Sequence, residues 1–213
     1  MKKVTAKLPA KKDNDKLAIH GLRLEEAVFH LVGTSPLIQK RISDDTIEDL
    51  ERKSEGLSKK SRAPKSKQAQ FEESYYKMKR GFGHPAAGFK SSIVEGNRNK
   101  TNYAPRIISK WFFVFGDPET NLIPIVGTPI ARTDNFRCRA GLGSTTRAFY
   151  PIWSCQVKIE FDANKISLEQ LIQFVNTAGS VSGIGCWRPS APSSPGDFGR
   201  YTVLKVSNHK QVQ

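Results

Sequence analysis

The stretch "PIWSCQVKIEFDANKISLEQLIQFVNTAG" (Pro151–Gly179) decides the fold class, because a strand pattern and a helix pattern follow each other in it. Across residues 153–161 every second residue is apolar, which indicates a strand with one buried face. Across residues 168–175 the apolar residues follow helical spacing, and Ser167 precedes them as a cap with a glutamine three positions later. We expect Gly179 to end this helix.

The flanking sequence extends the pattern into a larger order of elements. That order is strand, helix, strand, strand, helix, strand, which predicts an α+β fold with a ferredoxin-like (RRM-like) βαββαβ core. Two helices are then expected to cover one face of an antiparallel sheet. The other predicted segments are a strand at 24–32, a helix in "GHPAAGFKSSIVEGNR" (83–98), a buried strand in "KWFFVFGD" (110–117), its hairpin partner "NLIPIVG" (121–127) and a closing strand "RYTVLKV" (200–206).

An insertion separates the first strand from the first helix. Residues 36–80 are predicted to be a mobile element, with Ser43 as the cap of a short helix. The stretch from Gly56 to Lys67 carries five basic residues and no acid, with little apolar content to pack. We therefore divide the chain into a basic N-terminal tail (1–21), one domain (22–206) that contains this insertion, and a C-terminal tail (207–213).

Charge limits the classes of partner. Lys and Arg total 34 against 20 acidic residues, a net charge of +14, which favours nucleic acid or an anionic membrane surface. No apolar run approaches the ~20 residues of a spanning helix, and the basic N-terminus lacks the apolar core of a signal peptide, so we expect no membrane. The scattered Cys138, Cys155 and Cys186 form no metal-binding spacing. They favour a reducing, cytoplasmic setting, and we expect no metal and no cofactor.

A glycine-rich stretch, "GSVSGIGCWRPSAPSSPGDFGRYTV" (179–203), lies between the second helix and the last strand. A dinucleotide fingerprint needs a strand before the glycines and a helix after them, and here that order is reversed. A flexible hairpin explains the glycines but not Trp187, Arg188 and Arg200. A loop for single-stranded nucleic acid explains both, because glycines let the backbone approach phosphates and the arginines supply charge. Trp187 then either stacks on a base or packs in the core.

Three stretches of the sequence resemble one known protein family. "HPAAGFKSSIVEGNR" resembles the proline-led helix of the RAMP superfamily, which is found in CRISPR effector complexes. The glycine-rich stretch resembles that superfamily's C-terminal loop, and "VFHLVGTSPLI" resembles its opening strand. The chain looks most like the repeated backbone subunit, with one ferredoxin-like core and an inserted thumb. The tail "GIGCWRP…FGRY" also resembles short proteins of phages and other mobile elements.

The resemblance implies an RNA-binding subunit that assembles along a guide RNA with copies of itself and other effector subunits. Lys90 and Arg98 would then face backbone phosphates, and Gly183, Gly185 and Gly199 would shape the loop. The basic stretch of the insertion would lie in the thumb.

Two further segments carry candidate chemistry. "RTDNFRCRAGLGSTTR" (132–147) is predicted to be a polar loop whose arginines and Phe136 suit the phosphates and bases of a strand. The alternative is a solvated loop with salt bridges to Asp134. His84 is interpreted as a structural or phosphate-contacting residue rather than a general base, and Asp44 and Asp45 as acids that favour a helix start.

The sequence therefore predicts a non-catalytic protein that binds single-stranded nucleic acid, prefers RNA and assembles side by side along the strand. The alternatives are a single-stranded DNA-binding or annealing protein of a mobile element, a RAMP-type endoribonuclease, and a structural assembly protein with incidental charge. The predicted nucleic-acid-binding residues are Lys59, Lys60, Arg62, Lys65, Lys67, His84, Lys90, Arg98, Arg132, Phe136, Arg137, Arg139, Arg147, Gly183, Gly185, Trp187, Arg188, Gly199 and Arg200.

Overall fold

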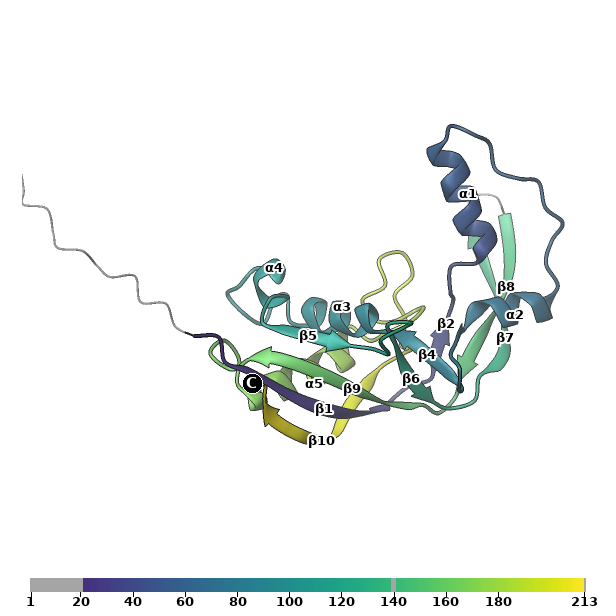
Figure 1. Cartoon of the computed structure of the whole chain (residues 1–213). Helices are drawn as coiled ribbons and strands as arrows, with labels where there is room; N and C mark the ends of the chain where they lie inside the picture. The colour runs from purple at the N-terminus through teal and green to yellow at the C-terminus, as the bar shows by residue number, and fades with distance from the viewer. Residues whose placement is uncertain (1–20, 139–140, 213) are drawn as a thin grey trace, which may run out of the picture.

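The computed structural model describes residues 21–138 and 141–212. Within these residues the main feature is a seven-stranded sheet with the order β10-β1-β9-β6-β4-β3, in which β5 also pairs with β9 (Figure 1). All its strand pairs are antiparallel. The strands are β1 (Leu24–Gly33), β3 (Tyr76–Lys77), β4 (Phe82–Pro85), β5 (Phe112–Phe115), β6 (Leu122–Val126), β9 (Ser154–Asp162) and β10 (Tyr201–Gln211).

The alternating pattern that predicted the central strands is the pattern of burial in them. Phe29 and Leu31 of β1 lie opposite Val157 and Cys155 of β9, and all four are buried. Because neighbouring side chains along a strand point to opposite faces, these residues build one apolar face of the sheet. The chain is therefore a mixed α+β protein with an antiparallel sheet, as predicted.

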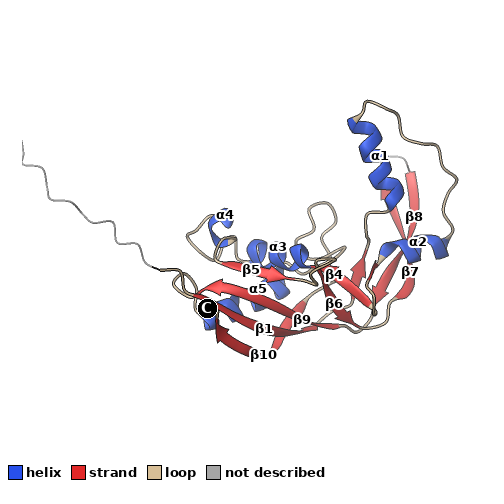
Figure 2. Ribbon diagram, in the orientation of Figure 1, coloured by secondary structure: helices blue, strands red, loops and turns tan. Residues whose placement is uncertain are grey.

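Two helices bury that face, as Figures 1 and 2 show. They are α3 (Ala86–Gly96) and α5 (Leu168–Val181), and a short helix α4 (Pro105–Ile108) follows α3. Phe89 and Ile93 of α3 join Leu171 and Val175 of α5 in the core. No helix within the described residues has both the length and the apolar character needed to cross a membrane.

The start of α5 confirms the prediction, and its end does not. Ser167 Oγ accepts a hydrogen bond from the Gln170 backbone, and Gln170 Oε1 accepts one from the Ser167 backbone, which is a capping box. Gly179 does not end the helix, which continues to Val181. A side chain on Gly179 would collide with the backbone carbonyl of Tyr201, so this glycine serves the close packing of α5 against β10.

A second sheet stands at one end of the molecule, with the order β2-β8-β7 (Figure 2). Its strands are β2 (Leu37–Gln39), β7 (Ile130–Cys138) and β8 (Gly141–Tyr150). The prediction of a polar loop at 132–147 is therefore wrong, because this segment forms most of a long hairpin. Polar cross-strand pairs support it, such as Thr133 and Thr146, whose hydroxyls lie 2.9 Å apart.

The insertion folds onto this hairpin. Besides β2 and β3 it supplies α1 (Asp44–Ser54) and α2 (Lys67–Ser74). The Ser74 hydroxyl of α2 accepts a hydrogen bond from the Ala148 backbone of β8, and Gln70 accepts one from the Thr146 backbone. We call β2, α1, α2, β7 and β8 together the thumb.

Two further segments differ from the prediction. Residues 121–127 do not form a hairpin with 112–117, because β6 pairs with β4 and with the Cys155 end of β9, while β5 pairs with its Phe161 end. Residues 207–211, expected to belong to a tail, continue β10 and reach Glu25 of β1 through Gln211. The predicted tail at 1–21 lies outside the described residues except for its last residue.

Candidate nucleic-acid interface

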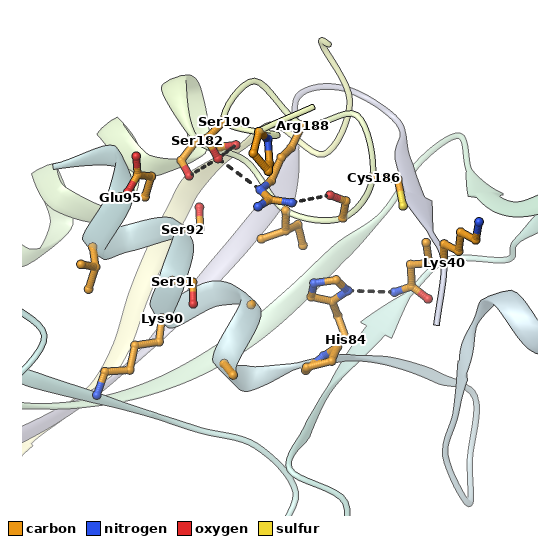
Figure 3. A pocket seen from close by; sticks show the side chains of 18 of the residues that line it. Lys40, His84, Lys90, Ser91, Ser92, Glu95, Ser182, Cys186, Arg188 and Ser190 are labelled. Carbon is orange, nitrogen blue, oxygen red and sulfur yellow. Dashed lines mark hydrogen bonds between the residues drawn. The ribbon is translucent and has the colours of Figure 1, made fainter. Parts of the chain in front are cut away.

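A groove with a cavity volume of about 950 Å³ lies between α3, the thumb strand β2 and the loop that joins α5 to β10 (Figure 3). Four residues predicted from the sequence line it, and they come from two separate parts of the chain. Its lining includes His84, Lys90, Gly185 and Arg188 from that prediction, together with Gln39 and Lys40.

Glycines let the loop 182–200 fold back on itself. Gly183, Gly185 and Gly199 have φ values of 67°, 78° and 68°, a conformation that disfavours any residue with a Cβ. The Gly199 carbonyl accepts a hydrogen bond from the Ile184 backbone at 2.9 Å, and Cys186 donates to the carbonyl of Ile38 in β2 at 2.8 Å. The loop is therefore attached to the thumb strand and closes one side of the groove.

Arg188 is the cation that this loop presents to the groove. Its Nε donates to Ser190 Oγ at 3.1 Å, and its Nη1 donates to the Gly185 carbonyl at 3.1 Å. Within the described residues it has no carboxylate partner. The guanidinium is therefore held in place by neutral groups, and its charge is left for a ligand.

His84 lies on the opposite side of the groove and is 7% exposed. Gln39 Nε2 donates to its Nδ1 at 3.2 Å and to the Gly83 carbonyl at 2.9 Å, which assigns the ring proton to Nε2. Burial, and to a lesser degree the positive charge of Arg188, lower the pKa of His84 to about 4. His84 is therefore a neutral hydrogen-bond donor at pH 7.

Two lysines complete the positive lining. Lys90 of α3 is half-buried, its Nζ lies 4.8 Å from the centre of the Phe113 ring, and burial lowers its pKa. Lys40 is exposed at the groove's edge. Glu95 also lines the groove, but it faces Arg98 at 3.6 Å. Among the described residues, neither lysine has a carboxylate partner.

The basic residues of the insertion have a different environment. Arg62 contacts Asp49 at 2.7 Å and Glu48 at 2.6 Å, and Lys65 contacts Asp45 at 2.7 Å. Hydrogen bonds lower the pKa of all three carboxyls, from Lys60 and then Arg62 for Glu48, from Arg62 for Asp49 and from Lys65 for Asp45. The same hydrogen bonds raise the pKa of Arg62 and Lys65. Lys60 also contacts Glu48. These cations attach the stretch 58–65 to α1, while Lys59 and Lys67 stay exposed.

Two arginines of the hairpin are also paired with an acid of the same chain. Arg132 and Arg147 both donate to Asp134 at 2.8 Å, which matches the salt-bridge alternative. The Arg147 guanidinium lies 4.0 Å from the centre of the Trp187 ring. Trp187 thus packs on a buried arginine and connects the glycine-rich loop to the hairpin. Arg132 lies over Phe149 and Phe198 in a similar way.

The remaining predicted residues lie away from the groove lining. Arg137 and Phe136 are exposed toward the tip of the hairpin. Arg200 donates its backbone N–H to Ser35, and its buried Nε has no acceptor within the described residues. Arg98 is exposed at the end of α3, and Arg139 lies outside the described residues.

Sequence reasoning missed Gln39 and Lys40. Both lie in the segment interpreted as a mobile insertion, and no local pattern marks them. No group of three or more His, Cys, Asp and Glu side chains suited to a metal ion occurs in the part of the chain that the structure describes.

Comparison with known proteins gives a distant structural likeness. No family model matches the sequence, and no curated protein matches it. A chain in a cryo-EM structure of the Type III-B Cmr-beta complex bound to cognate target RNA is similar in structure, with a TM-score of 0.41 and 11% sequence identity. The match covers 90% of this chain and 61% of that one, so the present chain spans less than two thirds of its neighbour's length.

Proposed function

We propose that this protein is a non-catalytic subunit that binds single-stranded nucleic acid, with RNA preferred over DNA. The observation that carries the proposal is the groove, which Lys40, Lys90 and Arg188 line without carboxylate partners among the described residues. Arg62, Lys65 and Arg147 are paired with acids of the same chain. The three groove cations are not. An unneutralised cluster beside a glycine-rich backbone suits the phosphates of an unpaired strand.

We further propose that the fold is the ferredoxin-like core of the RAMP superfamily. The strands β10-β1-β9-β5 are antiparallel neighbours in that order, and α3 and α5 cover one face. This strand order supports the proposal of a split βαβ arrangement in one domain at 22–206. The thumb then corresponds to the insertion expected from the resemblance, enlarged by the hairpin.

The preference for RNA rests on hydroxyl and carbonyl groups along the groove. Ser91 of α3 and Ser190 of the loop both line it, beside the backbone of Gly185. Such groups donate to and accept from a ribose 2′-hydroxyl, which DNA lacks. We propose that several copies of the protein bind one strand together with other effector subunits, in a reducing, cytoplasmic setting. A guide RNA is one such strand.

Filter binding of paired RNA and DNA oligomers at rising salt tests the proposal. For single strands, log K falls with log salt by about 0.7 per phosphate neutralised, so three groove cations alone predict a slope of about −2. RNA is expected to bind more tightly than DNA of the same sequence. A flat salt response would contradict the proposal.

Other outcomes would favour the alternatives. Tighter binding of DNA would favour a single-stranded DNA-binding or annealing protein. RNA cleavage products that disappear in a His84→Ala variant would favour a RAMP-type endoribonuclease. Purification without any excess absorbance at 260 nm, together with a flat salt response, would favour a structural assembly protein.

A further inference from the structure

One ring nitrogen of His84 opens into the groove and has no hydrogen-bond acceptor among the described residues. His84 is 7% exposed, and its Nδ1 is occupied by Gln39. Its Nε2 therefore carries the proton, and no described residue accepts a hydrogen bond from it. The atom is reached from the groove rather than sealed inside the protein, so an acceptor on a ligand in the groove can take this hydrogen bond.

Gly88 keeps the space in front of this N–H open. A Cβ at position 88 would lie 2.7 Å from His84 Nε2, closer than van der Waals contact allows. The glycine lies inside α3, where alanine favours the helix more. Gly88 is not one of the described glycines with a positive φ, so backbone strain does not explain why a glycine occupies this position. Access to Nε2 does.

Arg188 faces the same space from the glycine-rich loop (Figure 3). Its Nε and Nη1 are bonded to Ser190 and to the Gly185 carbonyl, which leaves Nη2 without a hydrogen bond to any described residue. A fixed guanidinium and a neutral imidazole N–H together offer two donors and one positive charge. That combination fits the oxygens of a phosphoryl group.

We propose that His84 and Arg188 form a phosphate subsite that holds one backbone phosphodiester of the bound strand. This inference rests on the proposed function. Gln39 is a positioning residue, because it fixes the His84 ring and in turn accepts from Tyr150 of β8 at 3.3 Å. The subsite is therefore assembled partly by two thumb strands, β2 and β8, and its occupation links the strand to the base of the thumb.

The test follows the His84 ring nitrogens of the full chain by ¹⁵N NMR. The probes are inorganic phosphate and an eight-nucleotide RNA without terminal phosphates, which offers internal diesters only. Both probes are expected to shift the Nε2 resonance in the unmodified protein. In Gly88→Ala the added methyl blocks Nε2, so the shift is lost and RNA affinity falls by about tenfold. Ser180→Ala, at an exposed position of α5, is the matched helix control and is expected to bind RNA unchanged.

A second pair of variants keeps the test decisive if Gly88→Ala does not fold. Arg188→Gln is expected to weaken RNA binding by about tenfold or more, whereas Arg106→Gln, on exposed α4, changes it by less than about twofold. RNA binding with an unmoved Nε2 resonance, or equal losses in both arginine variants, overturns the subsite and leaves the proposed function standing. Loss of all RNA binding by the unmodified chain overturns the function itself. A response to inorganic phosphate but not to RNA overturns the subsite as a place for the strand.

Discussion

Replacement of Asp134 by asparagine is expected to destabilise both the hairpin and the glycine-rich loop. The Asp134 carboxylate bonds Arg147 at 2.8 Å, and the two side chains are only 9% and 6% exposed. The Arg147 guanidinium lies on Trp187 at 4.0 Å, and its Nε has no acceptor within the described residues. Asparagine keeps the size of the side chain but removes the charge, so it leaves a buried cation uncompensated.

The magnitude follows from that burial. Removal of one partner from a buried ion pair costs about 3–5 kcal/mol in the free energy of unfolding. The pair with Arg132 is 34% exposed on the arginine side and adds less than about 1 kcal/mol. We therefore expect Asp134→Asn to lower the free energy of unfolding by about 4 kcal/mol. In a domain stable by about 5–15 kcal/mol, this is a large fraction.

Urea denaturation followed by tryptophan fluorescence and circular dichroism measures the loss. Asp197→Asn, at an exposed position of the same loop as Trp187, is the control and should change stability by less than about 0.5 kcal/mol. Arg147→Met removes the buried charge, so the double variant Asp134→Asn/Arg147→Met should lose at least about 2 kcal/mol less than the sum of the single losses. A loss below about 1 kcal/mol in Asp134→Asn, or strict additivity in the double variant, would refute the reasoning.

Three further predictions concern other parts of the molecule. Because burial lowers the pKa of His84 to about 4, the unfolded chain takes up this proton first as pH falls, so about 3 kcal/mol of stability is lost between about pH 6.5 and pH 4. Urea midpoints at pH 7, 5.5 and 4.5 should show a shallower decline in His84→Asn, and parallel curves would contradict the assignment. Arg62→Gln removes the main contacts between the stretch 58–65 and α1, so limited proteolysis should cleave that stretch faster. An unchanged cleavage rate would argue that Arg62 does not attach the stretch to α1. Gly179→Ala places a methyl against the Tyr201 carbonyl and should lower the free energy of unfolding by about 3 kcal/mol, measured by thermal or urea denaturation. Helix propensity alone predicts the opposite, a more stable variant, because alanine favours a helix more than glycine does.

The elements with strong local periodicity were predictable. The alternation across 153–161 and the helical spacing across 168–175 repeat every few residues, so they are visible without any knowledge of distant partners. The hairpin of β7 and β8 was not predictable in this way, because many of its side chains are exposed on both faces and its register depends on cross-strand pairs such as Thr133 with Thr146. The end of α5 was misplaced because Gly179 serves a contact with β10, not a helix cap.

In the candidate site, too, some features were predictable from the sequence and others were not. By itself the sequence determined the excess of positive charge, the glycines of the loop, and Lys90 and Arg188 as candidate cations. Only the tertiary structure decided which cations are neutralised. Arg62 and Arg147 meet carboxylates from other segments, while Lys90 and Arg188 meet none among the described residues. The reason is that the Coulomb interaction depends on distance in space, and the chain alone does not reveal which acid folds back onto which base.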